Sequence, residues 1–233
     1  MWGNFPARAN PSWIPPRGCD APVRSDSDAG VSTERVRPPR DSARREAILA
    51  TAARLLRQYG PAKTTMADIA REAHIGVGSL YLEFCSKDAI VEALSHDGHG
   101  KVLAAMSAAA GGDGGHGERL CAIFDARFEV FARLVAEGAH AGDLVHCNRS
   151  AVQRCHAEFM QAQRALLEAF LADAARAGTL APDDARDAAD ALLEAYEGFA
   201  PPRLDASCPR NRSRLAALHR IVLAGLLPRD AKG

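Results

Sequence analysis

The sequence of 233 residues has no excess of charge of either sign, because 29 Lys and Arg residues balance 29 Asp and Glu residues. A protein that coats a polyanion usually carries a large net positive charge, so neutrality disfavours that class but leaves room for a local basic surface. Long apolar runs are missing too. The run IVLAGLL at 221–227 is far shorter than the roughly 20 residues that span a bilayer. We expect no membrane partner.

Catalytic and disulfide signatures are also missing. The six cysteines are scattered and form no CxxC pair, which favours reduced thiols in a cytoplasmic protein over a secreted disulfide scaffold. There is no Gly-rich phosphate loop, no GxSxG, no HExxH and no placed pair of carboxylates. An enzyme is therefore the least favoured function, and we expect no cofactor and no bound metal.

The first 40 residues are rich in Pro, Ser, Asp and Arg and show no hydrophobic periodicity. Such a segment buries too little apolar surface to offset its ordering entropy, so residues 1–40 are predicted to be a disordered leader. Its basic end, with Arg35, Arg37 and Arg40, is either a solvated tail or an arm that contacts DNA. We favour the tail, because charge runs of this kind are common and generic.

Beyond residue 40 the apolar residues follow a helical period, and the fold class is predicted to be all-α. Ser42 is the expected N-cap of a first helix that ends at Gly60-Pro61. One face of this helix carries Ile48, Ala52, Leu55, Leu56 and Tyr59. Further helices are expected near 66–73, 77–84, 87–110, 118–137, 149–177, 183–198 and 211–226, with a short piece at 140–147.

Two short helices joined by a tight turn, at 66–84, predict a helix-turn-helix. Ala70 is small enough for the second helix to cross the first, and Ile69, Ile75, Leu80 and Phe84 supply a shared core. His74 stands in the turn, where the left-handed conformation favours glycine.

The second helix would present its outward residues to the major groove. Val77, Gly78 and Ser79 are short, so the helix can lie deep, where a serine hydroxyl or a valine methyl reaches base edges. Tyr81 and Lys87 suit phosphate oxygens beside the groove. Thr65, at the start of the preceding helix, either caps that helix or binds a phosphate.

Residues 48–94 carry these features in order: an aliphatic helix ending in Gly60, Thr64-Thr65, Ile69-Ala70, Gly78-Ser79-Leu80-Tyr81, Phe84 and Ser86-Lys87-Asp88. This set resembles the DNA-binding domain of the TetR family of transcriptional regulators. The resemblance implies a three-helix DNA-binding domain at 41–95 and a larger helical ligand-binding and dimerisation domain at 96–233. It also implies that the DNA-binding residues are Thr65, Val77, Gly78, Ser79, Tyr81 and Lys87.

Three positions depart from the family pattern. His74 replaces the usual turn glycine, Gly76 stands where a Ser-like cap often begins the recognition helix, and Glu83 places a carboxylate near the phosphates. Residues 41–95 contain as many basic as acidic side chains, so binding must depend on a few placed cations. We expect Lys87 to be the first of these, supported by Arg44, Arg45 and Lys63.

The C-terminal part holds most of the phenylalanines, and Phe124, Phe128 and Phe131 share one helical face. These residues and Phe159 are either plain core or the walls of a cavity for an apolar or amphipathic small-molecule effector. The last two predicted helices carry small and aliphatic faces, Ala188, Ala191, Leu192 and Ala195, then Leu215, Leu218, Val222 and Leu226. Such faces suit a four-helix interface in a homodimer that reads an inverted-repeat operator.

The segment HCNRSAVQRCH contains four possible metal ligands, His146, Cys147, Cys155 and His156. In one continuous helix the two cysteines would lie about 12 Å apart, too far for a disulfide or a shared metal ion. Because this spacing disfavours a shared site, a redox- or metal-sensing regulator acting through Cys147 and Cys155 is the alternative and not the leading hypothesis. The leading hypothesis is a dimeric DNA-binding repressor that a small molecule releases from its operator.

Overall fold

The computed structural model describes residues 39–228, with side chains from Ser42 onward. The disordered leader predicted for residues 1–40 lies outside the described residues, except that Pro39 and Arg40 already belong to the first helix. All regular structure in the described part is helical, which confirms the all-α prediction. The elements are α1 (Pro39–Lys63), α2 (Met66–Glu72), α3 (Val77–Glu83), α4 (Lys87–Ala110), α5 (His116–Ala136), η1 (Gly142–Leu144), α6 (Ser150–Arg176), α7 (Ala185–Ala195), η2 (Glu197–Phe199) and α8 (Asn211–Leu226).

The first helix differs from its prediction at both ends. It begins at Pro39 and not after Ser42, because the fixed φ of proline suits the first turn of a helix and its missing N–H costs nothing there. It kinks at Gly60, which has φ 79° and ψ 159°. Tyr59 was expected on the buried face, but α1 kinks at the next residue and the side chain of Tyr59 is 49% exposed.

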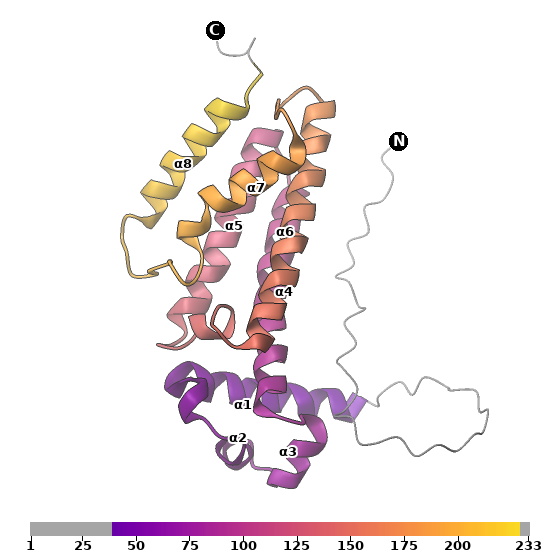
Figure 1. The fold of residues 1–233 in the computed structure, drawn as a ribbon, viewed down its shortest axis with the longest axis vertical. Coiled ribbons are helices and arrows are strands. Elements are labelled where there is room, and N and C mark those ends of the chain that lie inside the picture. Colours follow the sequence, from indigo (N-terminus) through magenta and orange to yellow (C-terminus); the bar gives the residue numbers. More distant parts are fainter. Residues whose placement is uncertain (1–38, 229–233) are drawn as a thin grey trace, which may run out of the picture.

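The helices form two hydrophobic cores that share α4. Figure 1 shows α1, α2 and α3 at one end of the molecule and the remaining helices in a bundle above them, with α4 reaching from one group into the other. Ile90 and Leu94 of α4 pack with α1, α2 and α3. Val102 and Met106, further along the same helix, pack with α5, α6, α7 and α8. The domain boundary predicted after residue 95 therefore falls inside a continuous helix.

The segment between α5 and α6 packs against the end of α1. The backbone N–H of His140 donates to the carbonyl of Arg57 over 3.0 Å. A Cβ at Gly138 would lie 2.7 Å from that same carbonyl oxygen, so only glycine permits this approach. Leu144 from this segment is buried in the core formed by α1, α2 and α3. The bundle and the helix-turn-helix end are thus in direct contact outside α4.

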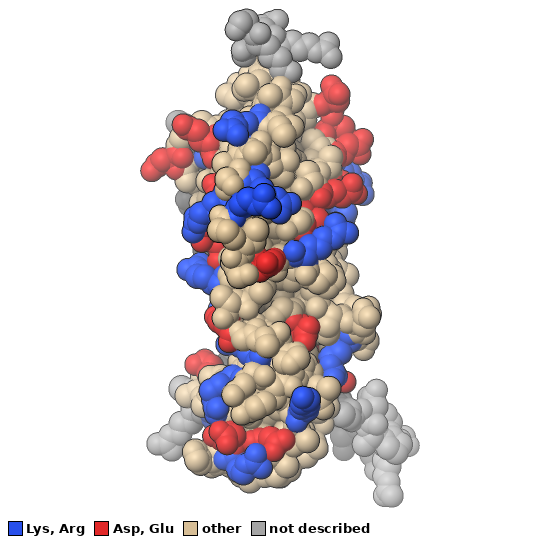
Figure 2. Space-filling view, turned by 90° about the vertical axis from the view of Figure 1, so that its left-hand side faces the viewer, with Lys and Arg blue, Asp and Glu red and all other residues tan. Residues whose placement is uncertain are grey.

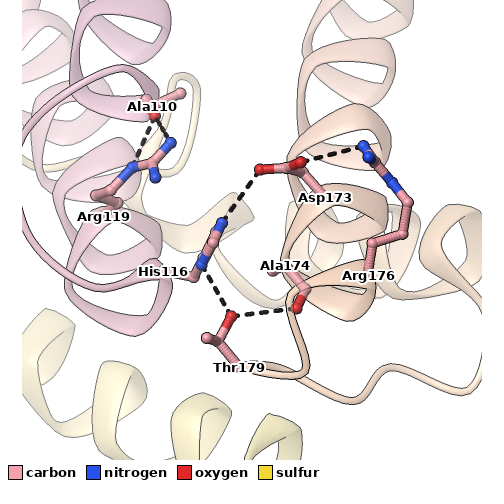
Figure 3. Close-up of polar contacts among 7 residues, drawn as sticks. All are labelled: Ala110, His116, Arg119, Asp173, Ala174, Arg176 and Thr179. Carbon is pink, nitrogen blue, oxygen red and sulfur yellow. Dashed lines mark hydrogen bonds and ion pairs between the residues drawn. The ribbon is translucent and has the colours of Figure 1, made fainter. Parts of the chain in front are cut away.

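The end of the bundle remote from α1 is closed by polar contacts (Figure 3). The side chain of Arg119 donates to the carbonyl of Ala110, which satisfies the C-terminal end of α4. Thr179 donates to the carbonyl of Ala174 over 3.1 Å, so its oxygen accepts from Nδ1 of His116 at 2.8 Å. Nε2 of His116 lies 3.3 Å from a carboxylate oxygen of Asp173. All of these contacts are satisfied together when both ring nitrogens carry hydrogens.

Helix α8 is fixed to the bundle by a chain of hydrogen bonds that runs from buried Tyr196 and His219 to Asp125 at the surface. The phenol of Tyr196 lies 2.7 Å from Nδ1 of His219, and Nε2 of His219 lies 3.0 Å from a carboxylate oxygen of Asp125. The phenol can donate to Nδ1 while Nε2–H donates to the carboxylate, so one neutral tautomer satisfies both contacts. Burial of the phenol raises the pKa of Tyr196, which keeps it a donor.

The substitution Tyr196→Phe should lower the free energy of unfolding by about 1–2 kcal/mol, because it leaves a buried imidazole nitrogen without a partner. Urea denaturation followed by circular dichroism measures this. Tyr59→Phe is the matched control, since that phenol is 49% exposed and its loss should be neutral. Equal effects of the two substitutions would show that this chain of hydrogen bonds contributes nothing to stability.

Candidate nucleic-acid interface and ligand cavity

Helix α2 begins with a capping box. The Oγ1 of Thr65 accepts from the N–H of Asp68 over 3.1 Å, and the N–H of Thr65 donates to the Asp68 carboxylate over 3.1 Å. The side chain of Thr65, then its backbone and then Arg71, hold the pKa of Asp68 below its usual value. Of the two roles expected for the exposed hydroxyl of Thr65, the structure therefore shows capping, while the side chain remains at the surface.

The turn between α2 and α3 places His74 at φ 54°, the left-handed region that the sequence pattern predicted. The N–H of Ile75 donates to the carbonyl of Ala70 over 3.0 Å and closes the turn. Ala70, Ile69 and Leu80 are fully buried where the two helices meet. The geometry is that of a helix-turn-helix.

Helix α3 turns its apolar residues both inward and outward. Leu80 is buried, while Val77 is 42% exposed and Tyr81 is 51% exposed. Gly78 is exposed as well, and no atom lies within 4 Å of the position of a Cβ there. Ser79 is half-buried. The structure thus brings four of the predicted DNA-binding residues together on one short helix.

Leu82 is a surface residue that reasoning from the sequence missed. Its side chain is 87% exposed on α3, next to Tyr81. A single exposed leucine is ordinary, but Leu82 lies on the same short helix as exposed Val77 and Tyr81. The sequence could have indicated this exposure, because Tyr81 and Leu82 are neighbours. A helix of seven residues that buries Leu80 cannot also bury both of them.

Two of the cations expected to meet phosphates are engaged inside the protein. Nζ of Lys87 donates to the carbonyls of Pro61 at 2.6 Å and Thr64 at 2.9 Å. Arg45 donates to the carbonyl of Glu83 over 3.0 Å, and its guanidinium lies 4.0 Å from the centre of the Phe84 ring. These cations fix the ends of α1 and α3. Arg44 and Lys63 are exposed.

The bundle contains a cavity of about 300 Å³ between α4, α5, α6 and α7. Phe131 and Phe159 line it. Phe124 and Phe128 do not: Phe124 stacks on Tyr196 with ring centres 3.8 Å apart, and Phe128 meets Phe199 edge to face. The other lining residues are His99, Arg127, Val145, His146, His156, Met160, Arg164, Asp190, Leu193, Glu194, Glu197, Ala200 and Pro201.

Three histidines meet at this cavity. The ring centres of His146 and His156 lie 4.9 Å apart, and His99 stacks on Phe159 at 4.5 Å. Burial, and then the neighbouring His156, lower the pKa of His99 to about 3. Burial, and then His146, also lower the pKa of His156. These two rings are therefore neutral near pH 7.

The four possible metal ligands of the HCNRSAVQRCH segment are divided between different surroundings. Helix α6 begins at Ser150, so the chain bends between the two pairs. His146 and His156 meet at the cavity, whereas Cys147 packs against the core of α1, α2 and α3. The thiol of Cys155 lies within 4.8 Å of ligand atoms of Glu92 and His96. Cys147 and Cys155 are both free thiols.

The described residues thus combine a helix-turn-helix, whose second helix is exposed, with a helical body that encloses a cavity. A family model described as bacterial regulatory proteins of the tetR family matches residues 48–94. Residues 48–94 therefore resemble the part of the TetR family regulators that this model describes, and this match includes the helix-turn-helix formed by α2 and α3.

Solved structures with the same fold cover nearly the whole described chain. A TetR/AcrR family regulator from Thermobifida fusca is 24% identical with a TM-score of 0.62, over 78% of this chain and 98% of that one. The ketosteroid regulator KstR2 of Mycobacterium tuberculosis is 23% identical with a TM-score of 0.56, over 80% and 96%. FadR from Bacillus subtilis, in complex with stearoyl-CoA, is 16% identical with a TM-score of 0.62, over 77% and 98%.

A comparison with curated protein sequences gives no significant match. Among the described helices, none has the length and apolar character needed to cross a membrane.

Replacing His74 by glycine should stabilise the protein by about 0.5–1 kcal/mol, because the left-handed conformation costs a side chain more than the added chain entropy of glycine. The midpoint of thermal unfolding measures this. The matched control is Gly178→Ala, which places a side chain at φ 68° where nothing lies within 4 Å, and which should destabilise. A loss of stability in His74→Gly would show that the imidazole makes a contact that outweighs the strain.

Proposed function

We propose that the chain is a dimeric repressor that binds an inverted-repeat operator in the cytoplasm and is released from it by a small amphipathic molecule. The observation that carries this proposal is the exposed face of α3. A soluble helix of seven residues exposes Val77, Tyr81 and Leu82 together, although burial of each would stabilise the fold. A surface of this kind is retained when a partner covers it.

Each residue of this face has a role that its position supports. Val77 and the hydroxyl of Ser79 contact base edges, and Gly78 lets the helix lie deep in the groove. Tyr81 donates to a phosphate. The hydroxyl of Thr65 donates to the Asp68 carboxylate over 2.6 Å and must leave it to donate to a phosphate. Lys87 already donates two hydrogen bonds to carbonyls, and an ammonium has three donors, so one remains for a phosphate. Leu82 adds an apolar contact to this set.

A neutral protein can still bind DNA through such a surface. Figure 2 shows basic and acidic side chains interspersed over one face, including its lower part, where the helix-turn-helix unit lies. A diffuse field of this kind gives little non-specific affinity. Binding then depends on shape and on a few placed donors at α3, so the operator sequence contributes a large share of the affinity.

The second copy of the chain packs on α7 and α8. Ile221 of α8 is 70% exposed, and Ala191 and Ala195 of α7 are exposed. Small residues let helices approach closely, and an isoleucine supplies apolar area at the centre of such a contact. Leu192 and Leu215 were expected on this face but are buried within the chain, where they hold the two helices on the bundle.

The ligand cavity communicates with the DNA-binding end through the segment between α5 and α6. Val145 and His146 line the cavity, while the adjacent Leu144 packs in the core of α1, α2 and α3. Gly98 of α4 permits this arrangement, because a Cβ there would lie 2.8 Å from Val145. A ligand that displaces His146 therefore moves a residue that packs against the DNA-binding helices.

A thiol-sensing regulator finds less support. Burial raises the pKa of the Cys155 thiol to about 11, so the reactive thiolate is scarce near pH 7. Cys147 lies in other surroundings, so the two thiols do not form a sensing pair.

DNA binding is tested by adding bulk where the structure leaves room. Gly78→Leu and Gly100→Leu are matched, since each glycine is in a helix and has no atom within 4 Å of the Cβ position. We expect Gly78→Leu to weaken binding to DNA from the protein's own upstream region at least about 10-fold, because the helix can no longer lie in the groove. Gly100→Leu should leave binding unchanged.

Footprinting with the wild type locates the protected segment, which should be an inverted repeat. Tyr81→Ala should weaken binding by about 10-fold at fixed salt, and Tyr59→Ala should not, although the two phenols are equally exposed, at 51% and 49%. Equal losses in both members of either pair would contradict the assignment of α3 as the recognition helix.

The substitution Ile221→Glu should convert the dimer to a monomer, because it places a charge at the centre of the apolar contact. Sedimentation velocity measures the change. Leu82→Glu is the control: it replaces an even more exposed apolar residue at the opposite end of the molecule and should leave the dimer intact. A dimer that survives Ile221→Glu would place the two-fold axis elsewhere.

A further inference from the structure

The cavity in the bundle contains a buried positive charge. The side chain of Arg127, on α5, is 4% exposed. Its Nε donates to Oε1 of Gln163 over 2.7 Å, and one terminal nitrogen donates to the carbonyl of Tyr196 over 3.2 Å. The guanidinium carbon lies 5.3 Å from the centre of the Phe131 ring. These contacts fix the orientation of the group, and all of them are to neutral partners.

No carboxylate among residues 42–228 forms an ion pair with Arg127. Glu197 is near enough to raise its pKa but pairs with Arg203 at 3.0 Å, and Asp190 pairs with Arg164. Burial lowers the pKa of Arg127 to about 10, so the group still carries its charge near pH 7. A buried, charged guanidinium without a counter-ion is strongly unfavourable, and proteins normally pair such a group.

The free donors of Arg127 face a cavity with further unmet polar atoms. A guanidinium has five N–H groups, of which two are used here, so a fork of donors remains. Nδ1 of His146 and Nδ1 of His156 are buried and have no hydrogen-bond partner among residues 42–228. Because Arg127, His146 and His156 all line the cavity, a molecule bound inside it would face these polar atoms.

The rest of the cavity selects what such a molecule looks like. Phe131, Phe159, Met160 and Leu193 form apolar walls, and the volume of about 300 Å³ suits a small ligand rather than a long chain. Glu194 and Glu197 also line the cavity and would repel a group with two negative charges. A planar group with one negative charge fits the guanidinium fork best.

We propose that the cavity binds a small carboxylic acid with a flat apolar body, whose carboxylate pairs with Arg127 and whose body lies against the apolar wall that includes Phe131 and Phe159. This inference rests on the proposed function for its regulatory meaning, since it names the chemical class of the effector. The histidines add hydrogen bonds to polar substituents of the ligand.

The test uses the full-length wild type and three matched pairs of compounds: benzoate, 2-naphthoate and 4-phenylbutyrate, each with its primary amide. Isothermal titration calorimetry near neutral pH gives the dissociation constants. We expect at least one acid to bind about 10-fold or more tightly than its amide, because a hydrogen-bonded charge pair contributes that much beyond a neutral contact. If no acid in the set binds more tightly than its amide, the proposal is overturned.

Two variants test whether Arg127 causes the preference for the acid over its amide. Arg127→Gln should remove the preference for the acid, while Arg164→Gln should keep it, although both arginines line the cavity, because Arg164 already pairs with Asp190. A preference for the acid that persists in Arg127→Gln would overturn the proposal. The comparison of acid and amide in the wild type does not depend on whether this variant folds.

The same compounds are then added to the complex with operator DNA. If an acid binds through Arg127 but leaves DNA occupancy unchanged, the result supports the proposed acid site and contradicts ligand-controlled repression. If an amide binds as tightly as the acid and releases the DNA, the result supports ligand-controlled repression and contradicts the proposal that Arg127 recognises a carboxylate. We expect the acid that binds to release the DNA, and its amide to do so only at concentrations about 10-fold higher.

Discussion

The burial of α4 in both hydrophobic cores is the constraint on which the rest of the structure depends. Ile90, Val91 and Leu94 belong to the core of the helix-turn-helix end, and Val102 and Met106 belong to the core of the bundle. A continuous helix resists bending because each turn is held by its own hydrogen bonds. Any movement of α4 in the bundle is therefore transmitted to α3, whose position depends on the residues that α4 buries.

The polar contacts at the start of α4 strengthen this connection. Lys87 holds the end of α1 through two carbonyls, and Arg149 of the segment before α6 pairs with Asp88 at 2.8 Å. The first turn of α4 thus contacts α1 on one side and the bundle on the other. The ammonium of Lys87 thus stabilises the arrangement of α1 and α4 within the protein itself. The net charge of the chain does not reveal this structural role.

The elements that the sequence predicted well are those fixed by local signals. Thr65 caps its helix, His74 adopts the left-handed turn, and α8 has the bounds that its apolar period predicts. Each depends on residues a few positions apart, so no knowledge of packing is needed. The start of α1 was placed too late because a serine was read as a cap where proline can begin a helix.

The cavity could be predicted only in part, because it depends on which face of each helix meets which neighbour. Phe124 and Phe131 share one face of α5, yet one stacks on Tyr196 in the core and the other lines the cavity. Arg127 lies between them in sequence and shows no motif. Only the three-dimensional structure shows that its charge is buried and that no residue among 42–228 forms an ion pair with it.

The separation of the cavity from α3 determines how a ligand can act. The acid proposed to bind Arg127 would lie in the bundle among α4, α5, α6 and α7, away from the surface of α3 proposed to contact DNA. Direct competition for one site is excluded, and release requires the ligand to bind more tightly to a conformation that holds DNA poorly. The ion pair between the ligand carboxylate and Arg127 supplies that difference in affinity if it forms with better geometry in one of the two conformations. His99 on α4 and His146 beside Leu144 are the lining residues from which such a difference reaches the DNA-binding helices.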